Sequence, residues 1–255
     1  MMVLLLEGFL LVALHIKKEV SPVNTITEVA VRVKASKSAM AVLMLAVVLP
    51  VVGLSAIGTA VLIVALMIGV LIEVVQARKK AKSFKARLYL KLLLFQMIIG
   101  LLSMYYIRRI PDGFQILVVV AASVFINDWL AQATGQALKN RGVTTHQLVP
   151  KISPAKTVEG LIGGLLFGWA GGYIALISLS GTMTISHPLL WLVVLFGPPL
   201  AVIGDLAESA TKRSLQIKDV GTVLGKHGGL MDRIDAVTAA MIGTLLILYL
   251  GKVYV

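Results

Sequence analysis

Long apolar segments separated by short polar ones make up most of the chain. A membrane-spanning helix needs about 20 predominantly apolar residues. Runs that approach or reach this length occupy residues 39–57, 59–76, 88–107, 114–130, 158–180, 188–206 and 236–251. The pattern therefore predicts an all-α fold, a polytopic integral membrane protein with about 7–9 transmembrane helices.

The N-terminal part of this pattern is less regular. The first two runs form one tract, in which Pro50, Gly53 and Gly58 would permit a helical hairpin. Residues 3–16 are a shorter apolar segment that contains Glu7. A signal peptide would need a basic start and a small-residue cleavage site. Both are missing from this segment, so we expect a retained helix.

Composition agrees with the apolar pattern. Hydrophobic residues make up 58% of the 255 residues and charged residues only 14%, whereas soluble domains average about 25% charged. The absence of cysteine excludes disulfides and thiolate chemistry. The formal net charge of +12 could indicate nucleic-acid binding, but the bases lie in short blocks between apolar runs. Membrane topology and anionic headgroups explain such blocks better, so we expect no nucleic-acid partner.

The distribution of basic residues predicts an orientation, because cytoplasmic loops of membrane proteins are enriched in Lys and Arg. The densest block consists of Arg78, Lys79, Lys80, Lys82, Lys85 and Arg87. Counting spans from this block places the loops 131–157 and 207–235 on the same side, with Arg108 and Arg109 outside as a modest exception. We expect a multi-pass protein of the cell (inner) membrane whose active site faces the cytoplasm.

One polar cluster is far denser than the rest of the chain. The segment from Asp205 to Asp235 contains five of the 12 acidic residues, five basic residues and His227. Ionisable groups beside a bilayer are costly to desolvate. This density predicts an active site at the membrane surface, in preference to a solvated loop.

The first half of the cluster is expected to continue the helix of the preceding apolar run. Asp205, Ser209, Lys212 and Arg213 are spaced i, i+4, i+7 and i+8, which places them along one helical stripe. A carboxylate is a hard ligand for magnesium, and the cations can neutralise phosphate oxygens. An ordinary interfacial helix with a Glu208–Lys212 ion pair is the alternative interpretation.

The second half of the cluster favours the interpretation as a site. Gly225, Gly228 and Gly229 allow the backbone to approach a phosphate closely, and the next helix begins near Asp232. Asp232 and Asp235 can face one point from a single helical turn. Phosphate would repel both carboxylates unless a divalent cation lay between them.

The loop between the two halves carries Lys218, Asp219, Lys226 and His227. His227 could donate a hydrogen bond, act as a base or have a structural role in the loop. We favour the donor role, because phosphoryl and nucleotidyl transfer depend mainly on positioning and charge neutralisation.

These residues resemble the signature of the phosphatidate cytidylyltransferases, also called CDP-diacylglycerol synthases. The matching order is Ser209, two residues, Lys212-Arg213, four residues, Lys218-Asp219, then His227-Gly228-Gly229, two residues, Asp232-Arg233, one residue and Asp235. Upstream, SPAKTVEGLIGG at 153–164 is similar to the family's SPKKTxEGxxGG, and Asn127-Asp128 matches its acidic motif. That motif usually continues as DTxAY, whereas this chain has DWLAQ.

The resemblance implies a function and an organisation. Residues 121–255 would be the catalytic transmembrane region, and residues 1–120 would be transmembrane helices without a recognisable motif. The enzyme would be a nucleotidyltransferase of phospholipid biosynthesis that joins phosphatidate to CTP, giving CDP-diacylglycerol and pyrophosphate. Its cofactor would be Mg²⁺, and the family is compatible with a second cation such as K⁺. The expected assembly is a homodimer in the lipid bilayer.

The resemblance also implies roles for individual residues. The metal ligands would be Asp205 and Asp232. The catalytic residues would be Asp128, Ser209, Lys212, Arg213, Lys218, Asp219, His227, Arg233 and Asp235. The substrate phosphates would be bound by Ser153, Lys156, Thr157, Lys212, Arg213, Gly228 and Gly229.

Other functions fit the sequence less well. A related cytidylyltransferase that acts on another lipid phosphate, such as an ether lipid or a polyprenyl phosphate, would use the same chemistry and is the main alternative. A CDP-alcohol phosphotransferase would need an Asp-Gly pair followed by Ala-Arg and spaced Gly and Asp residues, and the chain has no such run. A membrane transporter would be expected to show repeated halves with broken helices, whereas the polar residues concentrate near the C-terminus.

Glycines mark one face of the run at 158–180. Gly160, Gly164, Gly168 and Gly172 repeat every four residues, so a neighbouring helix can approach closely on that face. A groove for acyl chains is the alternative. We favour helix packing, because faces of small residues are mainly contact faces.

Overall fold

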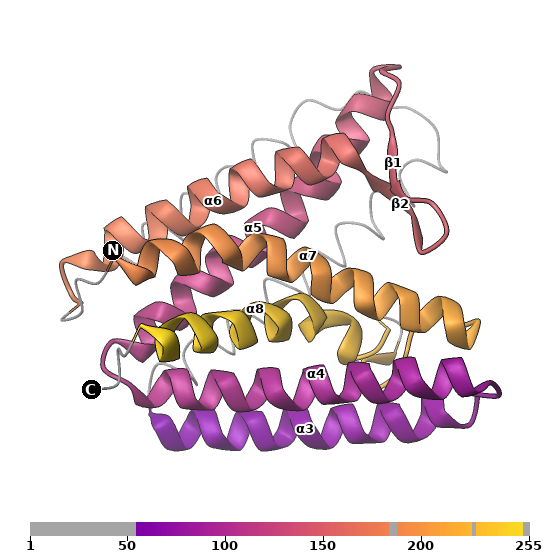
Figure 1. Ribbon diagram of the computed structural model, residues 1–255, viewed down its shortest axis with the longest axis horizontal. Helices are drawn as coiled ribbons and strands as arrows, with labels where there is room; N and C mark the ends of the chain where they lie inside the picture. The colour runs from indigo at the N-terminus through magenta and orange to yellow at the C-terminus, as the bar shows by residue number, and fades with distance from the viewer. Residues whose placement is uncertain (1–54, 184–187, 226–227, 252–255) are drawn as a thin grey trace. The chain divides into compact units, whose positions relative to one another are not determined.

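The computed structural model describes residues 55–183, 188–225 and 228–251. This part of the chain forms six long helices and a two-stranded sheet within one compact unit (Figure 1). The helices are α3 (Ala56–Arg78), α4 (Phe84–Arg109), α5 (Gly113–Asn140), α6 (Val158–Ser180), α7 (Leu189–Leu215) and α8 (Met231–Leu250). The strands are β1 (Gln147–Val149) and β2 (Ser153–Thr157).

Six of the predicted apolar runs correspond to these helices, and each helix is long and apolar enough to cross a membrane. The predicted fold class is confirmed: the chain is a multi-pass helical membrane protein. The described part contains six spans, where about seven to nine were predicted for the whole sequence. The predicted helix at 3–16, and all but the last three positions of the run at 39–57, lie outside the described residues.

Two helix ends differ from the sequence-based expectation, and a third agrees with it. Gly58 was predicted in a hairpin turn, but its amide donates to the N-cap Ser55 at 2.9 Å inside the first turn of α3, so that prediction was wrong. Helix α5 continues ten residues past its apolar run through AQATGQALKN, which was predicted as loop. Ala, Gln and Leu form helices well although Gln is polar, which explains the extension. Helix α7 continues to Leu215, as predicted.

A short β-hairpin precedes α6 and was not predicted. Strands β1 and β2 pair antiparallel, with Gln147 opposite Thr157 and Val149 opposite Ser153. Thr157 ends the hairpin and begins the helix, because its Oγ1 accepts a hydrogen bond from Gly160 N at 3.0 Å. The hairpin therefore holds β2 at a fixed place beside the start of α6.

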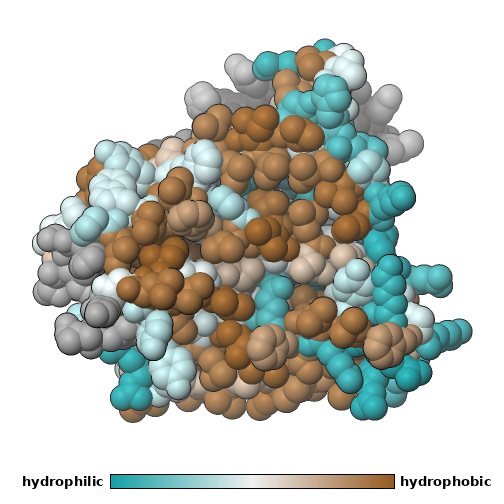
Figure 2. All heavy atoms as spheres, viewed as in Figure 1, coloured by the Kyte–Doolittle hydropathy of each residue, from teal (hydrophilic) through white to brown (hydrophobic). Residues whose placement is uncertain are grey.

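The polar connections of the described region gather at one end of the helices. Figure 1 places the α3–α4 turn, the β-hairpin and the segment between α7 and α8 at this end. The α4–α5 connection, the end of α6 and the start of α7 lie at the other end (Figure 1). Figure 2 shows hydrophobic residues over the helices and hydrophilic residues gathered along the edge where the first group lies. The described connections that carry predicted site residues thus lie at one end of the helices.

Two buried clusters hold the helices together. One joins α4, α5, α6, α7 and α8 around residues that include Ile107, Val120 and Leu248. The other joins α3, α4 and the start of α8 around Leu93, Met97 and Met231. The second cluster includes Ala81 in the α3–α4 turn and Met231 at the start of α8, so it supports the residues of the candidate site at this end.

The glycine face of α6 packs against α5. A Cβ atom at Gly164 would lie 2.6 Å from Cβ of Ala131, and one at Gly168 would lie 2.8 Å from Cβ of Asn127. Such distances leave no room for a side chain, so the predicted packing role is confirmed. The close approach also fixes the stretch of α5 that carries Asn127 and Asp128.

Helix α7 contains two prolines, and one of them leaves a carbonyl that Trp169 satisfies. Pro199 has no N–H, so it cannot donate to the carbonyl of Leu195 one turn earlier. The indole Nε1 of Trp169 on α6 donates to that carbonyl at 2.8 Å. This bond ties α6 to α7 where lipid offers no alternative donor.

The Trp169→Phe variant should therefore unfold at a lower temperature, with a loss of about 0.5–1.5 kcal/mol, because the carbonyl loses its donor while the aromatic ring remains. Circular dichroism of the purified protein in detergent measures the transition. Trp191→Phe is the matched control, since Trp191 makes a ring contact with Tyr173. Equal losses in both variants would contradict the role of the indole bond.

Candidate functional site

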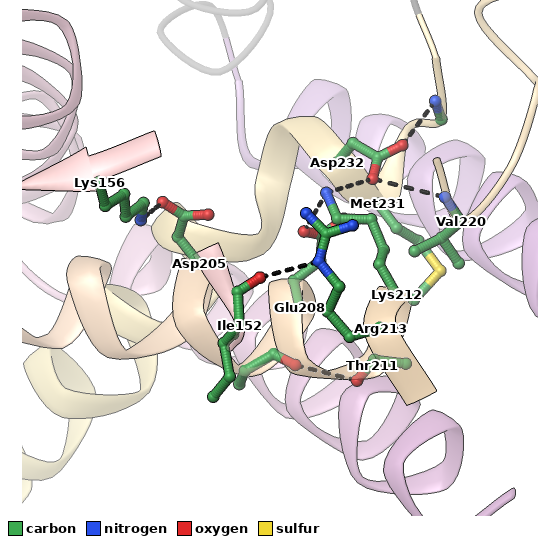
Figure 3. A network of polar contacts seen from close by, with 12 residues as sticks. Ile152, Lys156, Asp205, Glu208, Thr211, Lys212, Arg213, Val220, Met231 and Asp232 are labelled. Atoms are coloured by element: carbon green, nitrogen blue, oxygen red, sulfur yellow. Dashed lines mark hydrogen bonds and ion pairs between the residues drawn. The ribbon is translucent and has the colours of Figure 1, made fainter. Parts of the chain in front are cut away.

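The centre of the candidate site lies on the last three turns of α7. Glu208 is only 1% exposed, and its carboxylate forms an ion pair with Lys212 one turn later. Lys212 Nζ also contacts Asp232 Oδ1 at 3.2 Å, which joins α7 to the start of α8 (Figure 3). The predicted Glu208–Lys212 pair therefore exists. It is part of a larger network, and not an isolated surface pair.

The β-hairpin contributes a second lysine to this network. Lys156 points from β2 toward α7 and forms an ion pair with Asp205 (Figure 3). Burial lowers the pKa of the Lys156 ammonium, and the negative charge of Asp128 acts in the opposite direction. Asp128 is exposed on α5 and lies close enough for its charge to act on Lys156. Residues from α5, β2 and α7 thus face one region.

A backbone contact holds the hairpin in this place. Arg213 Nε on α7 donates to the carbonyl of Ile152 at 3.0 Å (Figure 3). The guanidinium group remains exposed. Arg213 therefore orients the hairpin through one nitrogen and keeps further donors for a ligand.

Three carboxylates form an acidic group that could hold a divalent cation. Oxygens of Asp205, Glu208 and Asp235 all lie within 4.8 Å of one another. Among the described residues, Oε1 of the buried Glu208 has no hydrogen-bond partner. Hard divalent cations prefer carboxylate oxygens. The donor set and the unpartnered oxygen therefore fit a divalent metal ion.

Asp232 lies beside this group in a different environment. Its Oδ2 accepts from Gly229 N at 2.8 Å, and its Oδ1 contacts Lys212 and Val220 N, the latter at 3.5 Å. The structure thus brings Asp205 together with Glu208 and Asp235, and connects Asp232 to them through Lys212. The predicted metal pair Asp205–Asp232 stays a prediction.

The glycines of the connecting segment adopt turns that favour glycine. Gly225 and Gly228 have φ values of +59° and +89°. A Cβ at Gly228 would lie 3.2 Å from Oδ1 of Asp219 and 3.5 Å from Oδ2 of Asp232. The backbone here passes close to both carboxylates. Lys226 and His227 lie outside the described residues, so the predicted role of His227 stays untested.

The remaining predicted residues are distributed around this centre. Ser209 is half-buried on α7, Ser153 is half-buried in β2, and Lys218 is exposed in the segment after α7. Thr157 is buried, and its hydroxyl caps α6. Arg233 lies in the first turn of α8. Their predicted roles as phosphate or catalytic groups stay predictions.

Sequence reasoning missed three residues of this region. Glu208 was treated as the partner of Lys212, although it follows Asp205 by three positions and so shares its helical face. Glu73 on α3 is fully buried and accepts hydrogen bonds from the start of α8, and Gln96 on α4 donates to Asp235 O at 3.1 Å. Glu73 had a detectable signal, because an acid inside an apolar run is a functional candidate.

Comparison with known proteins assigns the sequence to a family. A family model described as the cytidylyltransferase family matches residues 1–250. The phosphatidate cytidylyltransferase of Staphylococcus haemolyticus (strain JCSC1435) is 33% identical over 141 residues, which cover 54% of this chain and 50% of the relative. That of Aquifex aeolicus (strain VF5) is 38% identical over 146 residues, covering 56% and 50%.

A third relative is similar to a comparable extent. The phosphatidate cytidylyltransferase of Haemophilus influenzae is 36% identical over 120 residues, which cover 46% of this chain and 41% of the relative. The chain thus aligns with about half of the length of these curated relatives or less. The family match, in contrast, extends over almost the whole sequence, and the chain belongs to the cytidylyltransferase family.

Proposed function

We propose that the protein is a phosphatidate cytidylyltransferase, which converts CTP and phosphatidate into CDP-diacylglycerol and pyrophosphate. The observation that carries this proposal is the network of lysines and carboxylates contributed by β2, α7 and α8 at one end of six apolar helices. A lipid phosphate and a nucleotide triphosphate can meet at such an end. The names and sequences of the relatives support the same reaction.

The reaction is a nucleotidyl transfer. An oxygen of the lipid phosphate attacks the α-phosphorus of CTP, and the bond from this phosphorus to the oxygen that bridges to the β-phosphorus breaks. Pyrophosphate leaves with the electron pair. A phosphate monoester is already largely ionised at neutral pH, so the attacking oxygen needs no strong base. His227 then serves as a hydrogen-bond donor to phosphate.

The cations of the site position the phosphates and neutralise their charge. Lys156 and Lys212 each contact a carboxylate, which holds their ammonium groups on the two sides of the acidic group. Arg213 keeps donors free for a phosphate. Lys218, Asp219 and Arg233 complete the site from the connecting segment and α8. Fixed charges of this kind stabilise a transition state better than mobile water does.

Mg²⁺ is the proposed cofactor. Asp205 belongs both to the sequence-based pair with Asp232 and to the structural group with Glu208 and Asp235, so we assign it as a ligand in either arrangement. When bound, the ion neutralises charge on the triphosphate and on the leaving pyrophosphate. The carboxylates themselves keep the site from binding phosphate in the absence of a cation, because like charges repel.

We also propose that this end of the protein faces the cytoplasm from the inner membrane. The basic block between Arg78 and Arg87 lies at the same end as the site, since α3 ends where α8 begins. An excess of Lys and Arg marks the cytoplasmic side. Assembly as a homodimer in the bilayer is part of the same proposal.

Cysteine labelling tests this orientation, and the chain contains no native cysteine that would interfere. Ser83→Cys and Thr222→Cys should react with a membrane-impermeant maleimide only when the cytoplasmic face is accessible. Thr182→Cys, at an exposed position just after α6, should react only from the opposite face. Labelling of Thr222→Cys from the same face as Thr182→Cys would contradict the assignment.

A substrate panel tests the proposed reaction. The purified protein in detergent would be incubated with CTP, Mg²⁺ and phosphatidate, an ether-lipid phosphate or a polyprenyl phosphate, and pyrophosphate release would be measured. Release with phosphatidate well above the other two is expected. Preferential release with polyprenyl or ether-lipid phosphate would replace phosphatidate by the main alternative.

A further inference from the structure

Glu73 lies on α3, which is paired with α4, yet its carboxylate binds the segment that leads into α8. The side chain is fully buried on α3. Its Oε1 accepts from Leu230 N at 2.6 Å and from Val223 N at 3.3 Å, and its Oε2 accepts from Met231 N at 2.8 Å. Both oxygens therefore hold backbone amides of the connecting segment or of the first turn of α8.

Two glycines make this contact possible. A Cβ at Gly221 would lie 2.2 Å from Cγ of Glu73, so only glycine allows the backbone to pass here. A Cβ at Gly229 would lie 2.9 Å from Oε2 of Glu73 and 2.8 Å from Oδ2 of Asp232. Gly229 thus lies between the two carboxylates. A displacement of Glu73 would be transmitted directly to Asp232.

A second contact from the same helical pair acts on the next turn of α8. Gln96 on α4 donates to the carbonyl of Asp235 at 3.1 Å. A Cβ at Gly100, one turn later on α4, would lie 2.4 Å from Cβ of Thr238, so the two helices pack backbone to backbone. Helices α3 and α4 therefore fix both the start and the direction of α8.

We propose that Glu73 is a positioning residue of the active site. By binding three backbone amides, it holds the glycine segment and the first turn of α8 so that Asp232 lies beside Lys212 and Asp235 lies beside Asp205 and Glu208. The inference rests on the proposed function only for its effect on turnover. Only a carboxylate offers two acceptor oxygens here, because the amide group of Gln keeps one acceptor and would direct its NH2 group at the remaining backbone N–H.

Hydrogen exchange tests the contact without reference to activity. In Glu73→Gln, at least one of the amides of Val223, Leu230 and Met231 should exchange at least about tenfold faster than in the wild type, since glutamine keeps only one of the two acceptor oxygens. Gln76→Ala, an exposed position one turn later on α3, is the matched control and should leave these amides unchanged. Unchanged exchange in Glu73→Gln would overturn the proposal.

Turnover tests the consequence. On monodisperse, folded protein, Glu73→Gln should lower kcat by about a hundredfold, as expected for a misplaced reacting group. Saturating CTP, phosphatidate and Mg²⁺ should not restore it. Faster exchange with wild-type kcat would overturn the positioning role. A wild type that is inactive on all lipid phosphates would instead reject the proposed function, and the exchange result would still decide the contact.

A second variant covers the case in which Glu73→Gln does not fold. Gly221→Ala keeps the carboxylate and forces the backbone away from Glu73, because the added Cβ has no space. It should show the same faster exchange at Leu230 and Met231 and the same loss of kcat. Gly221→Ala with wild-type exchange and wild-type kcat would overturn the proposal.

Discussion

The Asp205→Asn variant should turn over at least about a hundredfold more slowly than the wild type, in line with the loss of one electrostatic stabiliser of a transition state. Asparagine keeps the shape of the side chain but removes the charge that pairs with Lys156 and belongs to the acidic group. Folding should survive, because the helical core is unchanged. Initial rates of CDP-lipid formation at varied Mg²⁺ concentration measure the effect.

The same experiment separates the two possible ligand sets. Asp232→Asn and Asp235→Asn should each lose activity. Only a variant that has lost a metal ligand should also need a much higher Mg²⁺ concentration to reach its half-maximal rate. Asp112→Asn is the control, since Asp112 lies in the α4–α5 connection at the opposite end. Near-normal turnover of Asp205→Asn at limiting Mg²⁺ would reject Asp205 as a ligand.

Loss of Lys212 should affect stability as well as activity. Lys212→Met removes the cation between Glu208 and Asp232, and Glu208 is buried. Removal of one partner from a buried ion pair destabilises by about 3–5 kcal/mol. Unfolding in detergent without added divalent cation measures this loss.

A double variant distinguishes the two effects. In Lys212→Met combined with Glu208→Gln, the buried charge on α7 is removed, and Asp232 keeps the amide donors of Gly229 and Val220, so most of the stability should return. Turnover should not return, because the cation that faces the phosphates is still missing. A single Lys212→Met variant with wild-type stability would contradict the ion-pair network described for α7 and α8.

The sequence predicted the elements that depend on local hydropathy. Six apolar runs correspond to α3 to α8, and the polar stripe beyond residue 206 corresponds to the polar end of α7. The extension of α5 to Asn140 was not predicted, because its residues are polar but form helices well. The β-hairpin was not predicted for another reason: strands as short as Gln147–Val149 carry almost no periodic signal and depend on a partner.

The candidate site was predictable where its residues follow one another at helical spacing. Asp205 and Lys212 were found in this way, and both lie in the network. Glu73 could have been recognised as a functional candidate because it lies inside an apolar run, but its partners are backbone amides more than a hundred residues away and could not be predicted. The contacts of α3 and α4 with α8 also bear on the predicted division at residue 120, which stays a prediction.

The position of the label in CTP shows which phosphorus the lipid phosphate attacks. The wild-type protein would be incubated with phosphatidate, Mg²⁺ and CTP labelled at either the α- or the γ-phosphorus. We expect the α-label to enter the lipid product, one for each pyrophosphate released, and the γ-label to appear only in pyrophosphate. Transfer of the γ-label to lipid, or release of the α-label as a free nucleotide without a lipid product, would contradict the proposed nucleotidyl transfer.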